Sequence, residues 1–122
     1  MMEQKYQLGN EYGSILWDIT AMLQNAADFP VVTCDVQALA AANPFHGNEA
    51  HIMETDLSLP LVVVELRPGV EKLIDGNHRL QKALRLGMTT IPVYRLTFQQ
   101  HRRYIVDYDE ATYQQVVRHW TA

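Results

Sequence analysis

Apolar residues recur at helical spacing in the stretch that precedes the first proline. The residues that would share one face of a helix are Ile15, Leu16, Ile19, Leu23 and Ala26. Ser14 stands just before this stripe, and its hydroxyl can accept a hydrogen bond from an early helical amide. Asp-Phe-Pro at residues 28–30 ends the pattern. We therefore predict a helix over residues 14–27.

Runs of apolar and β-branched residues predict strands in the second half of the chain. The valine-rich run at residues 61–66 is typical of a buried strand. Arg-Pro-Gly at residues 67–69 predicts a turn, and a second strand is expected at 70–74. A third strand is expected at 91–96, where Pro92 indicates either an edge strand or the beginning of a strand.

A helix with a marked inner face is predicted between the second and third of these strands. It covers residues 78–86, and its expected inward residues are Leu80, Ala83, Leu84 and Leu86. Gly87 is well placed as its C-terminal cap, because glycine accepts a positive φ.

Shorter elements complete the pattern. A strand is expected at 31–33, then a helix over 36–42 that Asp35 caps and Asn43-Pro44 breaks. The segment 45–56 is ambiguous, a loop with one helical stretch around 49–54. The last two helices are expected from Thr97 to about 104 and, after Asp109, over 110–120. The class is therefore α+β, with a small mixed sheet and packed helices.

The composition is that of a globular chain that fits a single domain, residues 1–122. Hydrophobic residues make up 48% of it and charged residues 20%. The net charge of −4 argues against broad nonspecific binding of nucleic acid, which rests on neutralising phosphates. Two local basic groups remain, the pair Arg102 and Arg103 and the helical trio Arg79, Lys82 and Arg85.

Cysteine usage and hydropathy restrict the setting. Cys34 is the only cysteine, so an intramolecular disulfide and a four-cysteine zinc site are excluded. Residues 1–9 are polar and lack the apolar core of a signal peptide. No apolar run approaches the length that crosses a bilayer. We expect a cytoplasmic protein with no membrane association; the sequence leaves its oligomeric state open.

The segment with the most chemical content joins a predicted strand to a predicted helix. It reads Asp75-Gly76-Asn77-His78-Arg79. The first amides of a helix lack internal partners and carry partial positive charge, so they form an anion site. Glycine permits close approach of a ligand. The candidate side-chain donors to a phosphate are Arg79, His78 and, one turn further, Lys82.

A purely structural interpretation of this segment stands beside the functional one. Junctions of strand, glycine and helix occur in many folds without a ligand. Arg79 would then pair only with a nearby carboxylate such as Glu65 or Glu71.

The same segment resembles the signature of the ParB/sulfiredoxin superfamily. The resemblance rests on residues 74–80, Ala83, Gly87 and the Ile-Pro-Val at 91–93, with an upstream proline and apolar strand at 59–64. It covers residues 31–104 approximately, which would be the core of the domain. It implies a ParB/sulfiredoxin-like fold and a nucleotide site that holds phosphates through Gly76 and Arg79.

The resemblance also separates this chain from true sulfiredoxins. Their motif places a reactive cysteine where this chain has Asn77, and Cys34 lies far upstream. Sulfiredoxin activity is therefore not expected, because no thiolate is available at the site.

Members of the superfamily that carry Asp-Gly-x-His-Arg include free-serine kinases and ParB-like proteins described as nucleases or CTP-dependent switches. Their resemblance implies a nucleotide such as ATP, ADP or CTP, and Asp75 as a ligand of Mg²⁺ or an orienting group. Asp75 and His78 are the candidate catalytic residues; a turn or N-cap role for Asp75 is the alternative. Partitioning ParB proteins carry a further helix-turn-helix domain, for which residues 105–122 leave little room.

Several polar residues outside the motif are weaker candidates. His46, Glu49, His51 and Glu54 fit no zinc pattern, and a polar surface loop is the simpler interpretation. If that loop covers Gly76, Glu49 or Glu54 is a candidate general base, as is Asp35 despite its cap role.

The C-terminal part offers two further groups. His101, Arg102 and Arg103 form either a solvated face or a phosphate contact. The aromatic residues are expected to pack the last helix, and they are Tyr104, Tyr108, Tyr113 and Trp120.

Three functions follow as hypotheses. The first is a nucleotide-phosphate-binding domain with NTPase or phosphotransferase activity. The second is a ParB-like nuclease or DNA-binding module, which the net charge disfavours. The third is a regulatory or partner-binding protein that keeps the fold without catalysis.

Overall fold

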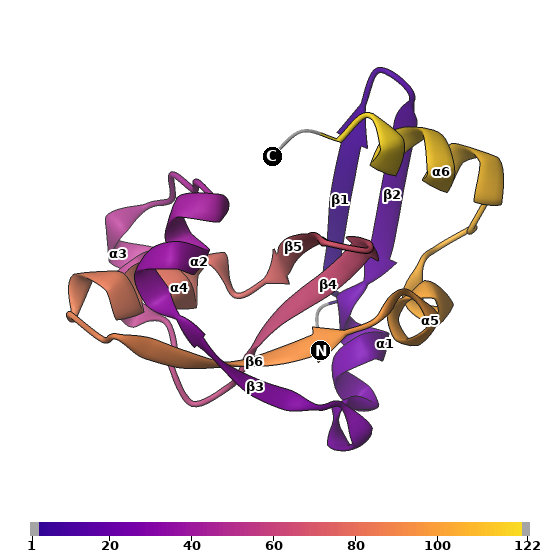
Figure 1. The fold of residues 1–122 in the computed structure, drawn as a ribbon. Helices are drawn as coiled ribbons and strands as arrows, with labels where there is room; N and C mark the ends of the chain where they lie inside the picture. Colours follow the sequence, from indigo (N-terminus) through magenta and orange to yellow (C-terminus); the bar gives the residue numbers. More distant parts are fainter. Residues whose placement is uncertain (1–2, 121–122) are drawn as a thin grey trace.

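The chain begins with a β-hairpin where the sequence pattern predicted a helix. In the computed structural model, which describes residues 3–120, β1 (Lys5–Asn10) pairs antiparallel with β2 (Gly13–Asp18). Helix α1 (Ile19–Gln24) follows directly (Figure 1). The predicted helix over 14–27 is therefore wrong at residues 14–18, which lie in β2, and Asp18 caps α1 instead of Ser14.

Alternation explains why the hairpin prevails over the helix. Ile15 and Trp17 of β2 are buried, whereas the residues between and beside them are less so. Leu8 of β1 lies opposite Ile15 and is also buried. The apolar residues of β2 thus fit the two-residue period of a strand as well as the 3.6-residue period of a helix. Pairing with β1 selects the strand.

A four-stranded sheet forms the centre of the molecule (Figure 1). Its strands lie in the order β3 (Val31–Asp35), β6 (Thr90–Leu96), β4 (Leu61–Arg67), β5 (Val70–Asp75). Only the central pair β4 and β6 is parallel. The predicted strands and the mixed sheet are confirmed.

Pro92 does not mark an edge strand. β6 lies between β3 and β4, and its ladder with β4 begins at Val93, one residue later. Pro92 therefore stands near the beginning of an inner strand, which was the second of the two predicted alternatives.

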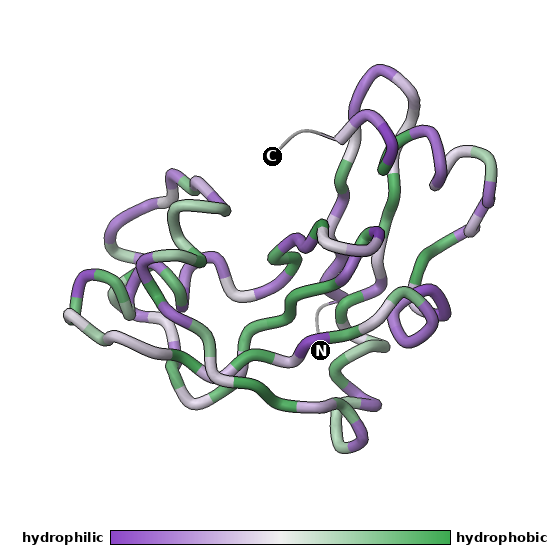
Figure 2. Tube along the Cα trace, viewed as in Figure 1, coloured by the Kyte–Doolittle hydropathy of each residue, from purple (hydrophilic) through white to green (hydrophobic). Residues whose placement is uncertain are grey.

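The sheet separates two hydrophobic cores. Val62, Val64 and Leu66 of β4 belong to one core, which the hairpin, α1 and α6 (Glu110–Arg118) cover. Leu61 and Val63 face the other core, beneath α2 (Val36–Ala42) and α4 (Asn77–Arg85). Figure 2 shows β4 as a largely hydrophobic stretch, as a strand covered on both faces requires.

The remaining helices are short. They are α3 (Glu49–Glu54), α5 (Phe98–His101) and the 3₁₀ turns η1 (Ala26–Asp28) and η2 (Arg102–Tyr104). The predicted helices after Asp35, around 49–54, after Thr97 and after Asp109 are confirmed. In α4, Leu80 and Ala83 are buried as predicted.

Two residues predicted to face inward do not. Leu84 is exposed at the surface of α4, and Leu86 is exposed just beyond its end. The helix is narrowly amphipathic, so only the positions that face the sheet are covered.

His101 lies in the core that contains the hairpin. It is fully buried, its Nδ1 accepts a hydrogen bond from Trp17 Nε1 (3.1 Å), and its Nε2 donates to the Glu65 carbonyl (2.8 Å). The prediction of a solvated face or a phosphate contact is therefore wrong for His101. The sequence did not reveal the hydrogen-bond partner of His101, because Trp17 lies 84 positions earlier in the chain, on the strand β2 that was not predicted.

Among residues 3–120, none of the helices has the length and apolar character needed to cross a lipid bilayer.

Candidate phosphate site at the start of α4

The junction predicted from the sequence is present. β5 ends at Asp75, and α4 begins at Asn77. Gly76 between them has a φ of +102°, which L-amino acids with side chains rarely adopt. A Cβ at this position would lie 2.6 Å from Leu61 Cγ, so neither the backbone nor the space admits a side chain.

The N-terminus of α4 differs from those of the other described α-helices. The other five have a side-chain cap, which Asp18, Asp35, Asn48, Thr97 and Asp109 provide. α4 has none. The first amide bonded within the helix is that of Leu80, to the Gly76 carbonyl (2.8 Å). Among residues 3–120, the amides of residues 77–79 have no protein acceptor, so they are available to an anion.

These amides stand beside a cavity of about 510 Å³. The polypeptide segments that line it come from β1 and the residue before it, α1, the loop on either side of α3, and the β5–α4 junction. The lining residues are Gln4, Tyr6, Leu23, Phe45, Thr55, Asp56, Leu59, Asp75, Gly76, Asn77, His78 and Arg79. Five of the six predicted site residues therefore line one cavity.

Asp75 is the hub of the hydrogen bonds at the floor of this cavity. Its Oδ1 accepts from Gln4 Nε2 and its Oδ2 from Arg79 NH2, both at 2.7 Å. The side chains of Asp75 and Arg79 are 7% and 11% exposed, so the ion pair is largely shielded from water. The structural alternative named Glu65 or Glu71 as partner of Arg79, but the partner is Asp75 itself, and Glu71 pairs with Arg95.

The Asp75–Arg79 ion pair leaves Arg79 able to bind a ligand. A guanidinium has five N–H groups, and only one bonds to Asp75. The pair holds the side chain at the cavity wall without using its remaining donors. Arg79 is therefore both oriented by the protein and open to an anion.

His78 and Lys82 occupy different surroundings. The His78 ring lies edge-on to Phe45, with 4.9 Å between ring centroids, and lines the cavity. Lys82 does not line it, because its ammonium donates to the Thr55 carbonyl (2.7 Å) at the end of α3. Lys82 thus fixes the loop that forms one wall.

Asp56 is a cavity residue that sequence reasoning missed. Its carboxylate accepts from the backbone amide of Ser58, which lowers the pKa of Asp56; nearby Arg79 and Lys82 lower it further. The Asp-x-Ser pattern at 56–58 is a local turn signal that could have indicated this placement. Gln4, Tyr6 and Phe45 have no such signal, since they reach the cavity only through tertiary folding.

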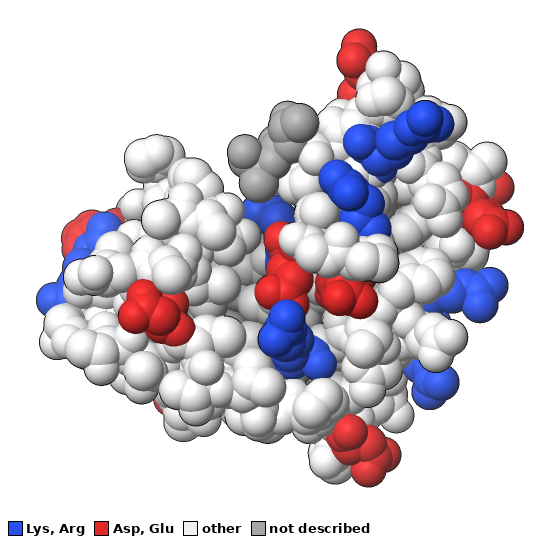
Figure 3. All heavy atoms as spheres, viewed as in Figure 1, with Lys and Arg blue, Asp and Glu red and all other residues white. Residues whose placement is uncertain are grey.

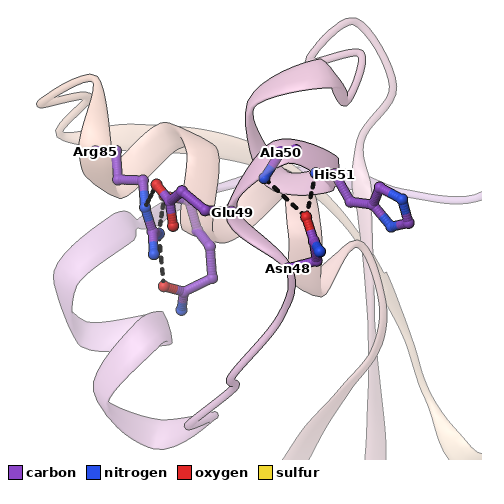
Figure 4. A network of polar contacts seen from close by, with 6 residues as sticks. Asn48, Glu49, Ala50, His51 and Arg85 are labelled. Atoms are coloured by element: carbon purple, nitrogen blue, oxygen red, sulfur yellow. Dashed lines mark hydrogen bonds and ion pairs between the residues drawn. The ribbon is translucent and has the colours of Figure 1, made fainter.

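The three candidate general bases lie outside the cavity. Asp35 caps α2 by accepting from the Ala38 amide (2.7 Å). Glu49 pairs with Arg85 of α4 at 2.6 Å, as Figure 4 shows, and Glu54 does not line the cavity. The loop around α3 nevertheless reaches the site, through residues on either side of the helix.

The polar residues of the α3 segment have structural partners. Asn48 Oδ1 accepts from the amides of Ala50 and His51, which caps α3 (Figure 4). Among residues 3–120, no group of three or more metal-ligating side chains comes together, so His46, Glu49, His51 and Glu54 form no metal site there.

The remaining sequence candidates lie elsewhere. Arg102 stacks over the Tyr108 ring at 4.8 Å, and Arg103 lines a separate cavity beside Phe29. Tyr104 and Tyr113 are buried in the hairpin-side core, where they pack as predicted. Cys34 is at the end region of β3, and burial raises the pKa of its thiol.

Comparison of the chain with protein-family models, with curated proteins and with solved structures gave no match.

Proposed function

We propose that this protein binds the phosphate groups of a nucleotide in the cavity at the start of α4. The observation that carries the proposal is the uncapped N-terminus of α4, which opens beside a cavity of about 510 Å³ that Arg79 and His78 also line. Amides, helix dipole and guanidinium all favour a negative charge at the same point. A ParB/sulfiredoxin-like relationship, expected from the motif, agrees with this proposal.

The dimensions of the cavity suit a ligand larger than inorganic phosphate. Its volume of about 510 Å³ lies in the range of small-molecule and cofactor sites. Its lining combines a polar end at the start of α4 with apolar side chains from Leu23, Phe45 and Leu59. A nucleoside phosphate such as ATP, ADP or CTP likewise combines a polar part, its phosphates, with a less polar part, its base.

A Mg²⁺ ion bound to such a nucleotide would find one open carboxylate. Asp75 already accepts two hydrogen bonds in a shielded position, whereas Asp56 lies exposed at the cavity. Mg²⁺ usually takes one or two carboxylates together with phosphate oxygens. We therefore assign Asp56 as the better metal ligand and give Asp75 the role of orienting Arg79.

The nuclease or DNA-binding alternative receives less support. Two of the three cations of α4 are bonded to protein groups away from the start of the helix, since Lys82 donates to the Thr55 carbonyl and Arg85 to Glu49. On the face shown in Figure 3, acidic and basic side chains are interspersed, apart from a small basic group next to α6. This face lacks the continuous positive stripe that is typical of proteins that bind along a nucleic-acid backbone.

Titration calorimetry with ATP, ADP, CTP and GTP, with and without Mg²⁺, tests the proposal. Arg79→Ala should weaken nucleotide binding at least about tenfold, because it removes charge-assisted hydrogen bonds. Arg79→Lys should restore part of the loss, since an ammonium keeps the charge without the paired donors.

Arg85→Ala is the matched control. It removes an ion-paired arginine from the same helix outside the cavity, so nucleotide affinity should stay at the wild-type value. Wild-type affinity in folded Arg79→Ala, with only the melting temperature reduced, would assign Arg79 a purely structural role and contradict the proposal.

A further inference from the structure

One wall of the cavity comes from the N-terminal segment. Gln4 bonds to Asp75, the residue directly before Gly76. Its backbone is held as well, because the Gln4 carbonyl accepts from the Ile19 amide (2.9 Å) and its amide donates to Thr20 Oγ1 (2.6 Å). The N-terminal segment is thus fixed at the phosphate end of the cavity.

Tyr6 lies one strand repeat beyond that anchor. Side chains at i and i+2 of an extended chain project to the same side, about 7 Å apart. Gln4 and Tyr6 both line the cavity, as that spacing requires. Tyr6 therefore lies about 7 Å along the chain from the residue that bonds to Asp75.

The side of the cavity that Tyr6 forms has the properties of a site for a flat ring. The Tyr6 ring is half-buried against the core, and none of the hydrogen bonds among residues 3–120 involves its hydroxyl. Leu23 and Phe45 line the same cavity. Leu59 also lines it and remains 54% exposed, an apolar side chain that the fold itself leaves uncovered.

We propose that Tyr6 and the apolar residues that line the same cavity hold the base of the nucleotide, with Tyr6 as the stacking platform. This inference rests on the proposed phosphate site. It makes the N-terminal hairpin part of the binding site, although the motif that indicated the site lies 70 residues away. The predicted ligand is a mononucleotide with its phosphates at residues 76–79 and its base against β1.

Calorimetry in one buffer can distinguish binding of the phosphates from binding of the base. The ligands to compare are inorganic tripolyphosphate and ATP, GTP, CTP and UTP. At least one nucleotide should bind about tenfold more tightly than tripolyphosphate, which is the size of effect that base stacking on an aromatic side chain gives. Tyr6→Leu should remove that advantage and leave tripolyphosphate affinity unchanged. Tyr6→Phe should keep most of it.

One control and a second test variant keep the test independent of folding. Tyr12→Leu changes the other tyrosine of the hairpin, which stacks on His119 outside the cavity, and should change neither affinity. Leu59→Ser alters an exposed residue and should weaken only nucleotide binding. In the wild type, nuclear Overhauser contacts between base protons and the Tyr6 ring should appear.

The outcomes distinguish the inference from the function on which it rests. Tripolyphosphate binding with no added affinity for any nucleotide would overturn the base site and leave the phosphate site standing. Equal losses for both ligands in Tyr6→Leu would also overturn it. Absence of binding by every one of these ligands would overturn both proposals.

Discussion

At the scale of single residues, Gly76 shows how one backbone position makes the site. Its positive φ lets β5 turn directly into α4, and Leu61 occupies the space where a side chain would stand. Gly69 also has a positive φ, +83°, but a Cβ there would meet nothing within 4 Å. Substitutions at the two glycines therefore distinguish the cost of a left-handed backbone from the cost of steric crowding.

We expect Gly69→Ala to lower the free energy of unfolding by about 1–2 kcal/mol, the cost of left-handed backbone. Gly76→Ala should lower it by about 1–3 kcal/mol more, because its methyl group collides with Leu61 and Arg79. Urea denaturation of both variants measures the difference. Equal losses would mean that the Gly76 junction is not crowded.

His101 makes stability depend on pH. Burial lowers its pKa from 6.5 to about 4 in the folded protein. Between these values the unfolded chain binds more protons, so lowering the pH from 6.5 to 4 should destabilise the protein by about 3 kcal/mol. Above pH 6.5 the contribution is complete, and below pH 4 no further loss arises from this group.

His101→Gln isolates that contribution, since glutamine offers an acceptor and a donor but does not titrate. The variant should be less stable at pH 7 and should show a smaller decrease in stability between pH 6.5 and 4. Chemical denaturation at several pH values gives both curves. Parallel curves would show that His101 is not the group responsible.

At the scale of elements, the N-terminal hairpin was the least predictable part. Residues 14–19 satisfy helical and strand periodicity together, so the choice depends on a partner strand, β1, whose own pattern is weak. The helices and strands after residue 30 were predictable, because capping residues, Asn43-Pro44 and Gly87 mark their ends locally. Leu84 was predicted to face inward but is exposed, since the sequence does not show how narrow the buried face of α4 is.

Gln4 is the expected link between the hairpin and the site. Gln4→Leu removes a hydrogen bond to the carboxylate of Asp75 and should lower the free energy of unfolding by about 1.5–3 kcal/mol. Gln7→Leu makes the same chemical change at an exposed position of β1 and should stay within about 0.5 kcal/mol of the wild type. Thermal and urea unfolding compare them, and similar losses in both variants would argue against the link.

At the scale of the whole molecule, the four-stranded sheet separates two hydrophobic cores. The cavity lies at the end of its edge strand, β5. The motif at 75–79 could be predicted as an anion site, because a strand, a glycine and a helix start are local features. The cavity wall that Gln4 and Tyr6 form could not be predicted, since Gln4 and its partner Asp75 are 71 positions apart in the sequence. Tyr6 and Phe45 likewise reach the cavity only through the tertiary fold.

The central claim is that the free amides at the start of α4 bind phosphate. A nitrogen–proton correlation spectrum of the wild-type protein, recorded during titration with pyrophosphate and then with ATP, tests it most directly. We expect saturable shifts that are largest for the backbone amides of residues 77–79, with smaller shifts in β1 when ATP is the ligand. Shifts that do not saturate, or that centre on other parts of the protein while residues 77–79 stay unchanged, would contradict the claim.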